Sequence, residues 1–193
     1  RDSQAYPTYD QSVAAGVDTM LTSISVSDYE NSVHRTIANN TSKVYSYTRN
    51  LIRTLKSQGY TIIAISGSPH ELVEQFVVRY GFDIWVGQHW FRDGDKFTGE
   101  IIKTHTDKEL IIKKIAEEYG LAFEDSYAIG DTAGDIGLLS IVDNPIAFNP
   151  TDELLEAAIE NGWKVVVERK NIAYHLESGA RSGQHRLSKY ETI

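Results

Sequence analysis

Hydrophobic positions follow two different spacings along most of the chain. Between Val44 and Leu55 they recur at helical intervals, and Gly59 stands where such a helix would end. Residues 60–65 then form a short run rich in β-branched apolar side chains, which predicts a strand buried on both faces. The chain before Ser42 is polar with scattered apolar positions and predicts only short helices.

The same alternation of helix and strand continues toward the C-terminus. We expect a helix that is opened by a capping box of Ser68 and Glu71 and ended by Gly81. The pattern then predicts a hairpin turn at 93–95, helices at 110–119, 136–140 and 152–161, and strands at 82–87, 126–129, 145–148 and 163–167. Strands that alternate with helices in this way predict an α/β fold with a Rossmann-like parallel sheet and helices on both faces.

Composition narrows the classes of function. The 193 residues are 41% hydrophobic and 24% charged, as in an ordinary globular protein. The net charge of -8 argues against a nucleic-acid surface, and no apolar run is long enough to cross a bilayer. Cysteine is absent, which excludes disulfides and thiolate chemistry and fits a cytoplasmic location. We therefore expect neither nucleic acid nor a membrane as a partner, and the oligomeric state stays open.

The first candidate site follows the strand predicted at 60–65. In parallel α/β sheets, ligands bind beyond the carboxyl ends of the strands. A helix N-terminus at this point would supply free N–H groups and a partial positive charge. Ser66 would add a hydroxyl and Gly67 would allow close approach, so the segment indicates a phosphate site. An ordinary strand-to-helix turn uses the same residue types and is the alternative.

Two carboxylates follow the strand predicted at 126–129. Asp131 and Asp135 are four residues apart on a tight turn. Magnesium prefers oxygen ligands, takes one or two protein carboxylates and completes its shell with water and substrate phosphate. We therefore predict a Mg²⁺ site at these two residues. Alternatively, Asp131 caps the next helix while Asp135 faces solvent.

Lys108 occupies the first turn of a predicted helix, after a second capping box of Thr106 and Glu109. A lysine at that position is unfavourable for the helix macrodipole. An anion such as a phosphoryl group or the Asp135 carboxylate would offset this cost. The alternative is an ordinary solvated lysine.

Taken in chain order, these segments resemble the second, third and fourth motifs of the haloacid dehalogenase superfamily. The motifs are carried by Ser66, by Lys108 and by the pair Asp131 and Asp135. The resemblance covers about residues 42–170. Finer features resemble the phosphoserine-phosphatase-like branch, subfamily IB, at residues 65–69, 97–99, 146–150 and 162–163.

This resemblance implies a Mg²⁺-dependent phosphomonoester hydrolase that forms an aspartyl-phosphate and acts on a small phosphorylated metabolite. Ser66 and the Gly67 amide would hold phosphate oxygens. Lys108 would neutralise charge on the nucleophile and on the phosphoryl group. Asp131 would bind Mg²⁺, and Asp135 would orient Lys108 or a metal-bound water. The implied parts are a partial helical cap at 1–41, a core domain at 42–178 and a polar tail at 179–193.

One motif of the superfamily is missing from this sequence. No apolar strand ending in Asp-x-Asp-x-Thr, which carries the nucleophile in such enzymes, precedes Ser66. We expect that strand upstream of Arg1, and we expect the chain as written to be inactive. A non-catalytic pseudophosphatase that binds a phosphorylated ligand and a phosphotransferase are the alternatives. Gly134 stands where some relatives carry an Asn that contacts the substrate phosphate, so this chain departs from the usual substrate contacts. The substrate itself is not predicted, because specificity in this family lies largely in the cap.

Overall fold

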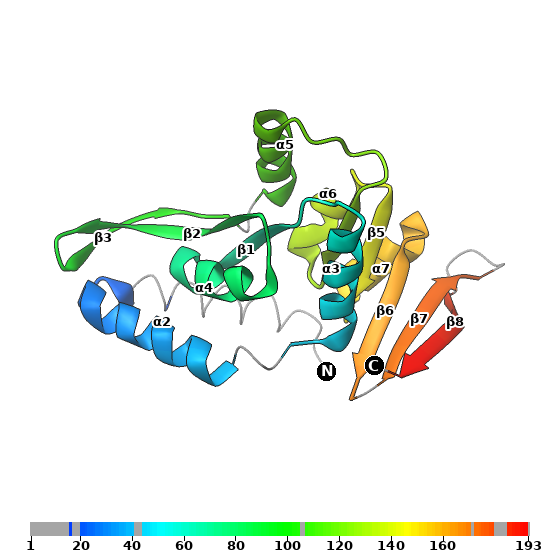
Figure 1. Ribbon diagram of the computed structural model, residues 1–193, viewed down its shortest axis with the longest axis horizontal. Helices are drawn as coiled ribbons and strands as arrows, with labels where there is room; N and C mark the ends of the chain where they lie inside the picture. Colours follow the sequence, from blue (N-terminus) through cyan, green and yellow to red (C-terminus); the bar gives the residue numbers. More distant parts are fainter. Residues whose placement is uncertain are drawn as a thin grey trace. The chain divides into compact units, whose positions relative to one another are not determined.

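The computed structural model describes residues 16, 20–40, 44–104, 107–170, 172–179 and 185–192. Its contacts divide the chain into two compact units, residues 1–43 with 61–104 and residues 44–60 with 105–193. Each unit contains a sheet and helices (Figure 1), which confirms the predicted α/β class, although the described strands pair in two sheets and not in one. The boundaries predicted at residues 41 and 178 stay a prediction. Within the described residues, no helix combines the length and the apolar character that a membrane crossing requires.

The first unit contains a three-stranded sheet. β1 pairs in parallel with β2, and β2 continues into β3 as an antiparallel hairpin. Helix α4 packs on β1 and β2, and α2 packs on α4 (Figure 1). The bounds are Val26–Asn40 for α2, Ile63–Pro69 for β1, His70–Tyr80 for α4, Ile84–Asp93 for β2 and Lys96–Ile102 for β3.

The hairpin of this unit turns where the sequence predicts it. Asp93 pairs with Lys96 across the turn, and Gly94 has a φ of 58°, a value that side chains disfavour. Asp95 accepts a hydrogen bond at 3.0 Å from the backbone N–H of Ser27, in the first turn of α2. The hairpin tip therefore caps this helix as well as closing the sheet. The core of the unit is formed by Leu21, Val26, Tyr29, Val33, Trp90 and Phe97.

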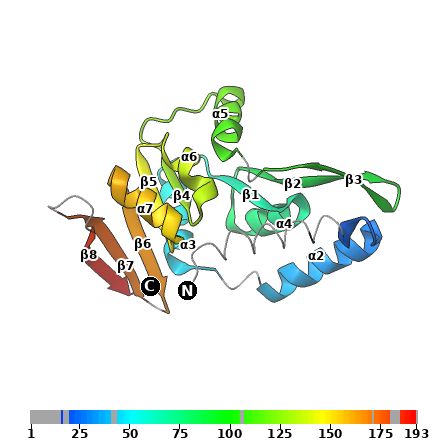
Figure 2. The ribbon, with the colours of Figure 1, turned by 180° about the vertical axis from the view of Figure 1, so that it is seen from behind.

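The second unit contains a five-stranded sheet in the order β4-β5-β6-β7-β8. Strands β4, β5 and β6 run parallel, and the last two are antiparallel to their neighbours. Figures 1 and 2 view this sheet from opposite sides and show α3 on one face and α7 on the other. The bounds are Ser46–Ser57 for α3, Lys108–Tyr119 for α5, Tyr127–Gly130 for β4, Ala133–Asp135 for the 3-10 helix η1, Ile136–Leu139 for α6, Asn144–Phe148 for β5, Asp152–Asn161 for α7, Lys164–Arg169 for β6, Ile172–Ser178 for β7 and His185–Thr192 for β8.

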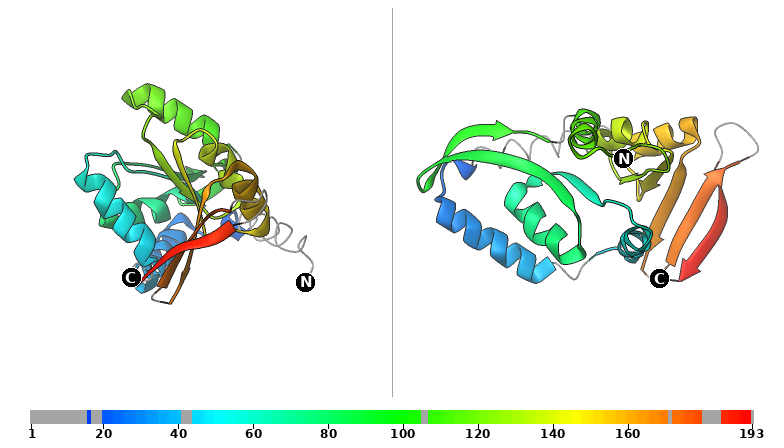
Figure 3. Two further views of the ribbon diagram at one scale, coloured as in Figure 1. Left: turned by 90° about the vertical axis from the view of Figure 1, so that its right-hand side faces the viewer. Right: turned by 45° about the horizontal axis from the view of Figure 1, so that its top comes forward.

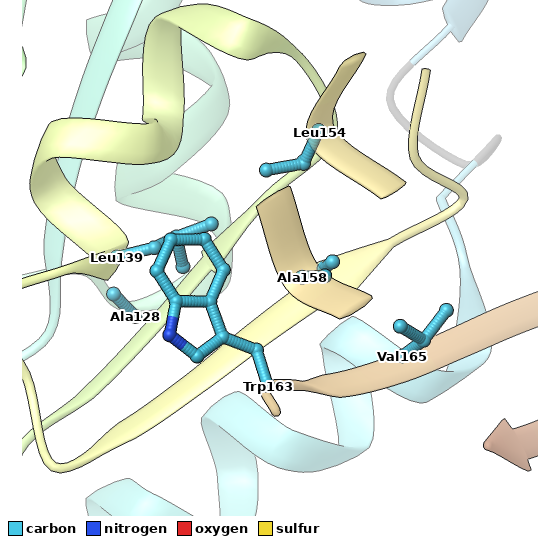
Figure 4. Packing of buried hydrophobic residues seen from close by; sticks show 7 residues of the cluster. Ala128, Leu139, Leu154, Ala158, Trp163 and Val165 are labelled. Atoms are coloured by element: carbon cyan, nitrogen blue, oxygen red, sulfur yellow. The ribbon is translucent and has the colours of Figure 1, made fainter. Parts of the chain in front are cut away.

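The parallel strands of this sheet are buried on both faces, as their apolar runs predict. In β5, Ala147 belongs to the cluster packed against α7, whereas Ile146 and Phe148 belong to the cluster packed against α3. Figure 4 shows the first of these clusters around Trp163. Its members are Ala128, Leu139, Ala147, Leu154, Ala158, Trp163 and Val165.

A carboxylate from β6 anchors α3 to the sheet. Glu168 is buried and accepts hydrogen bonds at 3.0 Å from the backbone N–H groups of Ser46 and Tyr47. The helix receives no such bond from the side chain of its own N-cap residue, Tyr45. A carboxylate at this end also complements the helix dipole. Residues more than a hundred positions apart in sequence are thereby fixed together.

The C-terminal segment contradicts the sequence prediction. The last predicted strand lies at 163–167, and a polar tail is predicted at 179–193. Strands β7 and β8 instead form an antiparallel hairpin that pairs with β6 (Figure 3). Most side chains of β8 are exposed, so this strand carries little of the hydrophobic signal used for the prediction. Main-chain pairing holds it, together with a 2.9 Å contact between His175 Nε2 and Glu191 Oε1.

Candidate active site

The two aspartates of the predicted metal site lie on the turn after β4. Asp131 is exposed, whereas Asp135 is only 4% exposed. The Oδ2 atom of Asp135 accepts three hydrogen bonds, from the backbone N–H groups of Asp131 and Thr132 at 3.1 Å and from the Thr132 hydroxyl at 3.2 Å. The alternative in which Asp135 faces solvent is therefore wrong.

The other oxygen of Asp135 holds Lys108. The distance from Lys108 Nζ to Asp135 Oδ1 is 2.6 Å, and the lysine side chain is only 14% exposed. Lys108 begins α5, whose N-cap is Asp107, while the predicted capping residue Thr106 lies outside the described residues. A buried carboxylate thus compensates a cation placed in the first turn of a helix. The alternative of a solvated surface lysine is also wrong.

Gly130 makes room for this arrangement, a role that the sequence pattern alone does not reveal. A Cβ atom at position 130 would lie 2.3 Å from the Cβ of Asp135 and 2.5 Å from its carboxyl carbon. Any side chain there would displace Asp135, so glycine is required by close packing. Thr132 was missed, although it supplies two of the three donors to Asp135 Oδ2. The available signal was a glycine directly before the first aspartate, at the end of a buried strand.

The electrostatic roles of the two aspartates differ. Both oxygens of Asp135 already accept hydrogen bonds, one of them from an ammonium group. This geometry favours the role of orienting Lys108 over the role of binding a metal. Asp131 is exposed at the carboxyl end of a parallel strand, where ligands bind in such sheets. The second unit therefore presents a fixed cation and an exposed carboxylate on neighbouring segments.

The residues around Asp131 fit a hydrated magnesium ion, although as a partial set of ligands. Among the described residues, no group of three or more His, Cys, Asp or Glu side chains is arranged to hold a metal. Magnesium needs only one or two protein carboxylates, because waters and substrate complete its shell. The Thr151 backbone N–H donates to the Asp131 carbonyl at 2.9 Å, and Thr151 Oγ1 is buried with no hydrogen-bond partner in the described part of the chain. Thr151 Oγ1, which lies beside the Asp131 loop, can accept a hydrogen bond from a water that a hydrated cation carries.

Ser66 and Gly67 belong to the first unit and lie within β1, not in the N-terminal turn of a helix. The strand continues to Pro69, and its pairing with β2 shifts register after Ile65. Ser66 Oγ accepts a hydrogen bond at 3.1 Å from the backbone N–H of Ser68, and Gly67 is exposed. A hydroxyl that accepts one hydrogen bond can still donate its proton to an anion. The predicted end of this strand at Ile65 is wrong, and the phosphate-binding role of Ser66 stays a prediction.

The capping box predicted for α4 does not form. The helix begins at His70 with Pro69 as N-cap, and no side-chain capping bond is made. Glu71 instead accepts a hydrogen bond at 3.0 Å from the Tyr29 hydroxyl and pairs with Arg92. Burial, together with the Glu71 charge, raises the pKa of Tyr29. Tertiary contacts therefore outcompete the local cap.

Residues 13–140 match the model of the haloacid dehalogenase-like hydrolase family, which covers more than half of the chain. The chain belongs to this family. A phosphoserine phosphatase from Methanocaldococcus jannaschii is 29% identical over 125 residues, which are 63% of this chain and 56% of that protein. The chain therefore spans about half the length of this curated relative. The match confirms the predicted resemblance to the phosphoserine-phosphatase-like branch.

Solved structures agree with this placement. A protein of unknown function from Bordetella pertussis Tohama I superposes with a TM-score of 0.67 at 20% identity, over 77% of this chain and 70% of that one, and shows the fold alone. A phospho-aspartyl intermediate analogue of phosphoserine phosphatase superposes with a TM-score of 0.53 at 26% identity, over 63% of this chain and 57% of that one. The similarity extends to both sequence and fold in the second case.

Proposed function

We propose that this chain is the greater part of a Mg²⁺-dependent phosphomonoester hydrolase that acts on a small phosphorylated metabolite through an aspartyl-phosphate. The observation that carries the proposal is the buried ion pair of Lys108 and Asp135 on the segments next to Asp131. Phosphoryl transfer depends mainly on positioning and on neutralising negative charge. Lys108 suits the task of neutralising charge, because its ammonium is held by a carboxylate whose two oxygens both accept hydrogen bonds. The similarity to phosphoserine phosphatases supports the same reaction class.

Each residue has a defined role in this proposal. Lys108 balances charge on the phosphoryl group, and Asp135 holds the lysine in place. Asp131 binds the cation, and Mg²⁺ when bound supplies charge neutralisation and orientation of phosphate oxygens. Ser66 and Gly67 belong to the first unit, and their binding of a phosphate oxygen through the hydroxyl and the backbone N–H stays a prediction that rests on the family resemblance.

The nucleophile is proposed to lie on a strand that this sequence does not contain. Within the described residues, β1 pairs only with β2, and β4 pairs only with β5. Each therefore presents one unpaired strand edge, and such an edge is a place where another strand can add. No Asp-x-Asp-x-Thr sequence follows an apolar run before Ser66. We infer that the 193-residue chain alone has no phosphatase turnover.

The test compares two forms of the protein with p-nitrophenyl phosphate and Mg²⁺. The chain as written is expected to release no phosphate. The same chain preceded by the upstream sequence of its gene is expected to show Mg²⁺-dependent release, which Asp131→Asn and Lys108→Met abolish. Glu109→Gln, which breaks only an exposed ion pair on α5, is the matched control and should keep full activity.

Three outcomes would change the proposal. If the 193-residue chain hydrolyses the substrate and Asp131→Asn abolishes that activity, the claim that the chain lacks its nucleophile is refuted. An upstream sequence without Asp-x-Asp-x-Thr, combined with phosphate or Mg²⁺ binding, would favour the non-catalytic binding module. Transfer of the phosphoryl group to a competing alcohol instead of water would favour the phosphotransferase.

A further inference from the structure

Thr151 joins the loop after β5 to the loop after β4. Its backbone N–H donates to the Asp131 carbonyl at 2.9 Å. The two loops follow neighbouring parallel strands, so both lie at the same edge of the five-stranded sheet. Thr151 is also the N-cap residue of α7, with an extended backbone at φ -64° and ψ 164°. The backbone hydrogen bond from Thr151 thus links the loop that contains Asp131 to the N-terminus of α7.

The hydroxyl of Thr151 makes no capping hydrogen bond, although a threonine at a helix N-cap ordinarily makes one. An N-cap threonine normally accepts a hydrogen bond from the backbone N–H two or three residues further on. Thr151 makes no side-chain capping bond, and its Oγ1 is buried without a partner among the described residues. Burying a hydroxyl without a hydrogen bond is unfavourable, and a bound water or ion is one of the recognised explanations for such an atom.

We propose that Thr151 Oγ1 is an outer-shell ligand of the cation at Asp131, hydrogen-bonded to a water that the cation carries. This inference rests on the proposed function, since the cation is the one assigned there to Asp131. Magnesium retains several waters, and those waters need oxygen acceptors in the protein. A neutral hydroxyl suits this outer position better than direct ligation, for which carboxylates are preferred. Thr151 is therefore a positioning residue and not a catalytic one.

The experiment measures Mn²⁺ binding by the electron paramagnetic resonance signal of the free ion, in the chain preceded by the upstream sequence of its gene, because the proposed nucleophile strand shares the cation with Asp131. Thr151→Val removes the hydroxyl and keeps the side-chain shape, whereas Thr151→Ser keeps the hydroxyl. Thr54→Val, at an exposed position of α3, is the control for the substitution itself. Loss of an outer-shell partner typically weakens metal affinity about 10-fold to 100-fold, and we expect about 10-fold for Thr151→Val. Thr151→Ser and Thr54→Val should bind as the wild type does.

A second readout separates this role from a structural one. Because Thr151 Oγ1 has no bond to lose, Thr151→Val should melt at the same temperature as the wild type, or higher, without metal. A lower melting temperature of the metal-free variant would show that the hydroxyl has a protein partner and would overturn the inference.

The remaining outcomes distinguish the inference from the function on which it rests. Unchanged Mn²⁺ affinity in Thr151→Val, with binding lost in Asp131→Asn, would overturn the role of Thr151 and leave the metal site standing. Unchanged affinity in Asp131→Asn would instead overturn the metal assignment in the proposed function. A wild-type chain that binds no Mn²⁺ would overturn both.

Discussion

Replacing Asp135 by asparagine measures the free energy lost when Lys108 stays buried without its carboxylate partner. The two charged atoms are 2.6 Å apart, and the side chains of Lys108 and Asp135 are 14% and 5% exposed. With an effective dielectric constant of about 20, their Coulomb attraction is about 6 kcal/mol before desolvation is subtracted. Breaking a buried pair by removing one partner typically costs about 3–5 kcal/mol, because the other charge is left buried. The asparagine carbonyl can still accept from Thr132, so we expect the lower end, a loss of about 3 kcal/mol.

The assay is urea unfolding of the second unit followed by tryptophan fluorescence. Trp163 lies in the core of this unit, whereas Trp85 and Trp90 belong to the first. A background of Trp85→Phe and Trp90→Phe therefore makes the signal specific for the unit that contains Asp135. The free energy of unfolding is then compared between this background and the same protein with Asp135→Asn.

An exposed pair on the same helix provides the control. Glu109 and Lys113 form an i,i+4 ion pair on α5 whose side chains are 38% and 52% exposed. Such pairs contribute about 0.3–0.5 kcal/mol, so Glu109→Gln should change little. Adding Lys108→Met to Asp135→Asn should recover part of the loss, because no uncompensated ammonium is then buried. A loss in Asp135→Asn no larger than in Glu109→Gln would refute the argument from burial.

Further predictions concern the core, the alkaline limit of stability and the packing behind the site. Leu154→Ala, at a fully buried position of α7, should cost about 2–5 kcal/mol in the same unfolding assay, whereas Leu110→Ala, at a 47% exposed position, should cost less than about 0.5 kcal/mol. Burial raises the pKa of Tyr47 from 10.0 to about 12, so the folded state holds this proton more tightly than the unfolded state does. Its contribution to the free energy of unfolding is therefore complete below pH 10 and is lost as the pH rises from 10 to 12. Tyr47→Phe should reduce the fall in unfolding free energy across that window, and an identical slope would contradict the assignment. Gly130→Ala should cost about 1–3 kcal/mol because its Cβ would overlap Asp135, and an unchanged urea midpoint would show that the turn can move aside.

Local signals in the sequence located many elements but could not assign partners across long separations. The helix at 152–161 and the hairpin turn at 93–95 were predicted correctly, because periodicity and turn residues encode them locally. The lysine at the start of α5 was recognised as anomalous for the helix dipole, which correctly raised Asp135 as a possible partner. The choice between that carboxylate and a phosphoryl group required the fold, because Lys108 and Asp135 are 27 positions apart.

Three failures have physical causes that a single sequence hides. Strands β7 and β8 are held by main-chain pairing at a polar edge, where the hydrophobic pattern is weak. The segment from Ser66 to Pro69 has the composition of a helix-opening turn, yet the strand continues to Pro69, which pairs with Gln88 of β2 beyond a register shift. Thr151 is unremarkable in the sequence as a helix N-cap. Its significance appears only when the fold shows a hydroxyl that caps nothing.

The two strands that carry candidate chemistry, β1 and β4, each have one unpaired edge among the described residues, as β3 and β8 also do. Ser66 lies on β1 and Asp131 follows β4, and each of these strands is terminal in its own sheet. A strand that paired in parallel with the free edge of β4 would end beside Asp131, because parallel neighbours present their carboxyl ends at the same edge. A carboxylate at the end of such a strand would be placed to share the cation with Asp131. The absence of Asp-x-Asp-x-Thr from the sequence and the open edge of β4 therefore support the same proposal from independent observations.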